Sequence, residues 1–164
     1  MQPVTGSVPI LNLGFRPFFA GAALFSLLSM LAWTAMYVFG RLAEASALPQ
    51  VIWHAHEMIY GYSMAVIAGF LLTAVRNWTG APTITGTPLL LLFLLWLTGR
   101  ILLAGGNSAL LQAAALSDAL FGAGLIFAIL VPIVRVRQWS QLGIVSKIML
   151  LIASNMVFYA GALG

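Results

Sequence analysis

Five long apolar runs dominate the pattern of apolar and polar positions along the chain. They cover about residues 18–39, 50–75, 87–103, 109–134 and 142–163. A helix of about 20 residues crosses the hydrocarbon core of a membrane, and it satisfies its own backbone hydrogen bonds there. The alternating segments typical of membrane β-barrels are missing. The pattern therefore predicts an all-α fold, a polytopic transmembrane helical bundle of about five spans that forms a single domain over residues 1–164.

Short polar segments separate these runs and contain turn-forming residues. GRLAEASALP occupies residues 40–49, RNWTGAPTITGTP occupies residues 76–88, and AGGNS occupies residues 104–108. Pro49 predicts the beginning of the second helix, because a first helical turn does not need the missing proline N–H. The first run is too long for the core of a signal peptide, so we interpret it as a spanning helix.

The composition agrees with a membrane protein. Hydrophobic residues make up 62% of the chain and charged residues 6%, with a mean hydropathy of +1.07, whereas about a quarter of the residues in soluble domains are charged. The isoelectric point near 10.1 rests on seven Lys and Arg, most of them at the ends of apolar runs, so it predicts no nucleic-acid partner. The absence of cysteine excludes disulfides, thiolate ligands and iron–sulfur clusters held by this chain.

The basic residues also predict the orientation of the bundle. A cytoplasmic N-terminus places five of them on the cytoplasmic side: Arg16, Arg76, Arg135, Arg137 and Lys147. The opposite side then has Arg41 and Arg100. Because Lys and Arg accumulate in cytoplasmic loops, we expect the N-terminus inside and the start of the second span on the outer face.

Both histidines of the chain lie at that outer end, within WHAHEM (residues 53–58). On a regular helix His54 and Met58 share a face, whereas His56 lies about 200° away from His54. The two histidines therefore serve different sites, or the segment is not helical. Imidazole and thioether suit copper or haem iron, and a carboxylate such as that of Glu57 commonly orients a ligating histidine. We predict His54 and His56 as ligands, Met58 as a further candidate, and Glu57 as a supporting group. An aromatic belt at the membrane interface is the alternative.

Two further charged residues are candidates for the surroundings of this site. Arg100 ends the third run on the same side, and Asp118 lies about 13 Å along the fourth run from its outer end. A carboxylate at that depth needs a partner, so Glu57, Arg100 and Asp118 are candidates for one polar network. The alternatives are an Arg100 that reaches to the interface and an Asp118 that is protonated or pairs with backbone. We interpret Asn155 as a helix–helix contact.

Small residues continue the face of His54 along the second span. Gly61, Ala65 and Gly69 follow at four-residue spacing, and such a stripe lets a neighbouring helix approach closely. We therefore expect His54, Glu57 and Met58 to point into the bundle.

Four short motifs together resemble the NnrS family of bacterial membrane proteins. They are LGFRPFF (13–19), WHAHEM (53–58), VIAGFLLTAVRNWTG (66–80) and LWLTGR (95–100), and the resemblance covers about residues 13–137. It implies a multi-pass protein of the bacterial inner membrane that contains haem and copper. It also implies a link to nitric oxide metabolism, nitrosative stress and denitrification.

The resemblance further implies that the chain is the N-terminal part of a larger architecture, because members of the family usually have more spans. Haem with two axial histidines needs them on facing helices, and both histidines here lie in one span. A complete site would then need the missing C-terminal half, a second copy of the chain in a homo-oligomer, or a five-coordinate iron.

The leading hypothesis is an integral membrane haem- or copper-binding protein, with nitric oxide or a metal–NO species as its ligand and the lipid bilayer as its surroundings. Whether it is an enzyme stays open, because nothing in the sequence indicates an electron donor or a substrate. One alternative is a transporter or channel component with a polar path near Glu57, Arg100 and Asp118. Another is an assembly subunit that binds no ligand.

Overall fold

The computed structural model describes residues 9–39 and 47–164, and every regular element in these ranges is helical. In chain order they are η1 (Pro9–Leu11), α1 (Phe15–Tyr37), α2 (Gln50–His56), η2 (Glu57–Ser63), α3 (Met64–Thr79), α4 (Thr87–Leu103), α5 (Ser108–Arg135), η3 (Trp139–Gln141) and α6 (Leu142–Leu163). The elements η1 and η3 are 3₁₀ turns, and η2 is a π-helix. The predicted all-α fold is confirmed.

Four helical stretches are long and apolar enough to cross a membrane. They are Phe15–Tyr37, Gln50–Thr79, Ser108–Arg135 and Trp139–Leu163. The fifth apolar helix, α4, has 17 residues, and its length of roughly 25 Å lies at the lower limit for a span. The structure is thus that of a membrane protein with four long helical passes and one short one.

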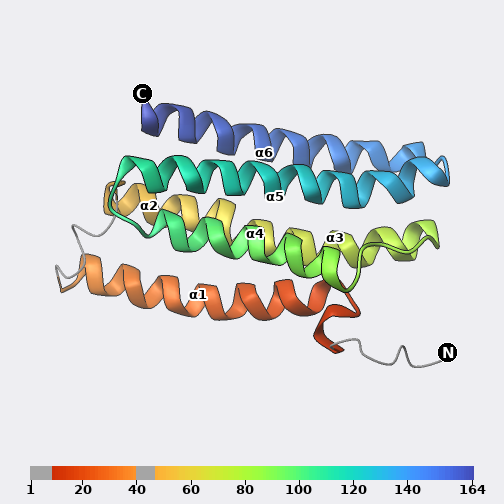
Figure 1. The fold of residues 1–164 in the computed structure, drawn as a ribbon, viewed down its shortest axis with the longest axis horizontal. Helices are drawn as coiled ribbons and strands as arrows, with labels where there is room; N and C mark the ends of the chain where they lie inside the picture. Colours follow the sequence, from red (N-terminus) through yellow and green to blue (C-terminus); the bar gives the residue numbers. More distant parts are fainter. Residues whose placement is uncertain (1–8, 40–46) are drawn as a thin grey trace.

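The long helices lie side by side, and the chain reverses direction from each pass to the next (Figure 1). The end of α3, the start of α4 and the end of α5 lie at one end of the bundle, which we call the basic end because it holds Arg76 and Arg135. The opposite end begins with α2 and is called the histidine end, because it holds His54 and His56.

Glycines with positive φ shape the connection at the basic end. Gly80 ends α3 with φ +66°, and its N–H donates to the carbonyl of Arg76 at 2.9 Å. Gly86 precedes α4 with φ +63°, and its N–H donates to Leu11 O at 2.9 Å. Residues with a Cβ rarely adopt such φ values. The connection between α3 and α4 is therefore fixed against the N-terminal turn η1.

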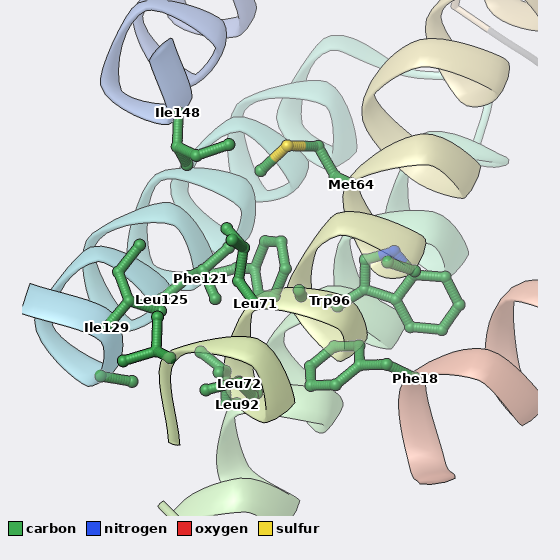
Figure 2. Packing of buried hydrophobic residues seen from close by; sticks show 14 of the residues in the cluster. Phe18, Met64, Leu71, Leu72, Leu92, Trp96, Phe121, Leu125, Ile129 and Ile148 are labelled. Carbon is green, nitrogen blue, oxygen red and sulfur yellow. The ribbon is translucent and has the colours of Figure 1, made fainter. Parts of the chain in front are cut away.

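Interlocked apolar side chains fill the centre of the bundle (Figure 2). Phe18 of α1, Leu72 of α3, Trp96 of α4 and Leu125 of α5 are each at most 1% exposed. Helices in lipid associate by close packing more than by burial of apolar surface. Gly69 shows this closeness, since a Cβ there would lie 2.8 Å from Phe19 Cδ1.

The second pass contains the main departure from the sequence-based expectation. The four-residue spacing of small residues predicts a regular helix through residues 54–69, but Glu57–Ser63 is a π-helix. Within it, the Ser63 hydroxyl donates to Met58 O at 2.8 Å, and Gly61 O accepts from Trp96 Nε1 at 2.9 Å. Short π-helical segments inside α-helices are frequent at functional sites. This one begins at the carboxylate that the sequence singles out.

Candidate functional site

The guanidinium of Arg100 joins two carboxylates inside the bundle. Its Nη1 donates to both oxygens of Glu57 at 2.9 Å, and its Nη2 donates to both oxygens of Asp118 at 2.5 Å. Glu57 is 0%, Arg100 4% and Asp118 5% exposed. The structure thus brings together three side chains from η2, α4 and α5 that the sequence placed near one another.

Helix α6 extends this network with two uncharged groups. Asn155 Nδ2 donates to Asp118 Oδ2 at 3.1 Å, and the Tyr159 hydroxyl donates to the same oxygen at 2.9 Å. Asn155 Oδ1 lies 2.8 Å from His56 Nε2. Because that amide oxygen only accepts, the network assigns the His56 proton to Nε2. The assignment leaves Nδ1 of a neutral His56 with a free lone pair.

That free nitrogen faces the carboxylate of Glu57. His56 Nδ1 lies 3.8 Å from Glu57 Oε1 and has no hydrogen-bond partner among the described residues. The imidazole is closely surrounded by the rings of Tyr60, Phe158 and Tyr159, with centroid distances of 4.5 to 5.2 Å. His56 is therefore held rigidly, with one nitrogen bonded and the other available.

His54 lies on the other side of the second pass. It is half-buried, and its ring stacks on Trp33 of α1 with centroids 4.4 Å apart and planes 20° from parallel. Its buried Nδ1 has no hydrogen-bond partner among the described residues. The two histidines contact different helices and do not converge. Met58 is half-buried as well.

Two glycines make room for the ion pairs. A Cβ on Gly61 would lie 2.5 Å from Glu57 Oε2 and 3.1 Å from Arg100 Nη1. A Cβ on Gly99 would strike Asp118 Oδ1. Gly61 belongs to the stripe that the sequence indicates, whereas Gly99 lies in the LWLTGR motif with a leucine four residues to either side, outside any small-residue stripe.

The charges of the network do not balance. Two carboxylates share one guanidinium, and both acids and the base are withdrawn from solvent. Buried charges are costly unless each is compensated. His56 is the remaining described group that can supply a positive charge to Glu57, either as imidazolium or through a cation bound at Nδ1.

A complete metal centre is not formed by the described residues. They contain no group of three or more His, Cys, Asp or Glu that could hold a metal ion. Both oxygens of Glu57 accept hydrogen bonds from Arg100. This carboxylate is therefore suited to orienting neighbouring side chains and not to binding a metal directly. The residues present fit single metal bonds from His54 and His56, with further ligands from outside the described part of the chain.

The same geometry gives no support to an open polar path. Glu57, Arg100 and Asp118 bond to one another and are buried. Sequence reasoning predicted these three because charges are rare in apolar runs, and it recognised Asn155 as a helix–helix contact. It missed Tyr159, although a hydroxyl four residues after Asn155 on the same helix face was a usable signal.

Comparison with known proteins identifies the family of this chain. A family model described as NnrS protein matches residues 9–164. No curated protein and no solved protein structure matches the chain. The family match includes the segments that supply Glu57, Arg100, Asp118 and both histidines. By the extent of this match, the chain belongs to the NnrS family.

Proposed function

We propose that this NnrS protein binds haem and copper in the bacterial inner membrane and takes part in the response to nitric oxide. Family membership supports the cofactors and the role, and the four long apolar helices support the location in a membrane. The observation that carries the proposal is that both histidines have a buried Nδ1 without a hydrogen-bond partner among the described residues, and that the Nδ1 of His56 lies beside the ion-pair network.

His56 suits a single ion better than a planar macrocycle. Aromatic rings of Tyr60, Phe158 and Tyr159 lie close around it, whereas its Nδ1 lies 3.8 Å from a carboxylate oxygen. A hydrogen bond from the second ring nitrogen, here to Asn155, is the usual way in which proteins orient a metal-binding histidine. We therefore assign copper to His56.

His54 suits the larger cofactor. It is half-buried, and it contacts Trp33 on one ring face. It lies near the end of the bundle, so a partner ligand would come from a second copy of the chain or from residues beyond those described. We therefore assign haem iron to His54. A bound haem iron or copper supplies a coordination position for nitric oxide, while the protein residues orient the imidazoles and exclude water.

The proposal is tested by the haem and copper content of His54→Ala and His56→Ala, purified from membranes as the full chain and as a family-length protein. We expect His54→Ala to lose haem and His56→Ala to lose copper. Met58→Leu should lower copper more than haem, because thioether is a soft ligand. Ile59→Ala, an exposed position on the same pass, is the matched control. Full cofactor content in both histidine variants would refute the assignment and leave the motif as an interfacial belt.

A further inference from the structure

A furrow follows the seam between α1 and α3, beginning at the basic end. Its first part is a polar cavity of about 230 Å³ with a lining that includes Thr73, Arg76, Asn77, Thr83 and Thr85. A water molecule occupies about 30 Å³ of liquid volume. The cavity therefore accommodates a polar group several times larger than water.

The side chains of this cavity favour an anion. The hydroxyls of Thr73 and Thr83 donate to the carbonyls of Gly69 and Leu72. The side chains of Arg76, Asn77 and Thr85 form no hydrogen bond with other described residues, so their donors are free. Arg76 is the one charged side chain in the described lining.

No described carboxylate neutralises that arginine. Glu57 and Asp118 are both bonded to Arg100. The positive charge of Arg76 and the free donors beside it thus remain available to a ligand.

The furrow continues from the polar cavity as an apolar groove. A second cavity of about 190 Å³ shares Thr73 and Asn77 with the first and is lined further by Phe15, Phe19 and Phe70. A third cavity of about 360 Å³ shares Phe19 with the second and reaches Ala23, Tyr62 and Val66. A polar, positively charged space therefore opens directly into an apolar one.

The length of the furrow matches one leaflet of a bilayer with its headgroup region. From Asn77 to Tyr62 the second pass rises by roughly 22 Å, which is half of the ~40–45 Å thickness of a bilayer with both headgroup regions. Trp78 is exposed beside the polar cavity, where aromatic residues mark the membrane interface.

We propose that this furrow binds an anionic phospholipid, with the phosphate against Arg76 and one acyl chain along α1 and α3. A free anion would occupy the polar cavity and leave the apolar groove empty. A neighbouring apolar helix would pack in the groove and leave Arg76 unpaired. The anionic phospholipid matches both parts at once.

The test is native mass spectrometry of the full purified chain, delipidated in detergent and titrated with phosphatidylglycerol or phosphatidylcholine of identical acyl chains. We expect the chain to bind phosphatidylglycerol at least about tenfold more tightly, because both lipids carry an anionic phosphate but the choline cation of phosphatidylcholine is repelled by Arg76. Arg76→Gln should abolish most of this preference. Arg135→Gln, an exposed arginine at the same end that lies outside these cavities, should keep it.

A second pair of variants tests the apolar groove. Ala23→Phe places a ring in the third cavity and should weaken both lipids equally, whereas Leu24→Phe on the exposed neighbouring position should not. Equal affinity for the two lipids, or an equal effect of the two arginine variants, would overturn the proposal. So would inorganic phosphate that binds through Arg76 without displacing the lipid, which would indicate a free-anion site.

Discussion

At the scale of single residues, Arg100 holds the interior of the bundle together. Its two ion pairs connect η2 to α5, and through Asp118 they reach α6. Removing one member of a buried pair costs about 3–5 kcal/mol when it leaves an uncompensated charge. A substitution is therefore tolerated better when it leaves a complete ion pair than when it leaves carboxylates without a cation.

Arg100→Gln is expected to destabilise the protein far more than Asp118→Asn. The first change leaves two carboxylates without a cation, whereas the second leaves the single pair between Glu57 and Arg100. We expect a difference of at least about 2 kcal/mol in the free energy of unfolding. Thermal unfolding of the purified variants in one detergent measures this difference. Equal destabilisation by the two substitutions would show that Glu57 and Asp118 are not both ionised.

Tyr159→Phe removes one hydrogen bond to a buried carboxylate. The expected cost is about 1.5–3 kcal/mol, the range for hydrogen bonds to charged groups. Tyr37→Phe is the control, because Tyr37 is 67% exposed and should cost little. The same unfolding measurement applies. A cost no larger than that of the control would place Tyr159 outside the network.

Glu57→Gln should reduce cofactor affinity without abolishing binding. The amide still accepts from Arg100, but it no longer offers a negative charge to His56 at 3.8 Å. Loss of such a supporting group typically lowers metal affinity by about 10- to 100-fold. Copper content measured against added copper checks this. Complete loss at saturating copper would make Glu57 a ligand in its own right.

At the scale of elements, apolar run length was a sufficient signal for the helices. The runs at 87–103 and 142–163 coincide with α4 (Thr87–Leu103) and α6 (Leu142–Leu163), because lipid requires each apolar segment to satisfy its own backbone. The π-helix could not be predicted in this way. One of its carbonyls, Gly61 O, accepts a hydrogen bond from Trp96, which is far away in the chain. No local pattern encodes that bond.

Glycines in the second pass should be less replaceable than their neighbour Ser63. Gly61→Leu would collide with the Glu57 carboxylate, and Gly69→Leu would collide with Phe19. Both should reduce expression and thermal stability more than Ser63→Leu. Gly143→Leu is the control, since a Cβ there meets nothing within 4 Å. Equal stability of all four variants would mean that the stripe faces lipid.

At the scale of the whole molecule, the ionisable groups were partly predictable. Charges are so costly in apolar helices that Glu57, Arg100 and Asp118 at similar depth were expected to meet. Asn155 and Tyr159 carry no charge and gave a weaker signal. The separate directions of His54 and His56 followed from helical spacing, but their neighbours Trp33 and Phe158 depend on how α1 and α6 pack.

The orientation in the membrane remains a prediction from the basic residues. A reporter fused after Gly80, at the basic end, should behave as cytoplasmic, and one fused near Ser46, outside the described residues, should behave as periplasmic. Five Lys and Arg against two motivate this expectation. The reverse pattern from both fusions would move the histidine end to the cytoplasmic face.

The shared guanidinium also constrains how the chain enters the bilayer. Glu57 is synthesised before Arg100, and Arg100 before Asp118, so Glu57 reaches the membrane before its partner Arg100, and Arg100 before its second partner Asp118. An Asp near the centre of a helix, as Asp118 is in α5, costs about 2.5–3.5 kcal/mol in helix insertion, and its partner Arg100 lies near the end of α4 that adjoins α5. Because only four residues separate α4 from α5, we expect these two helices to leave the translocon as a hairpin. A chain that presents α5 to the translocon without α4 should insert α5 poorly, and one that carries both helices should insert both.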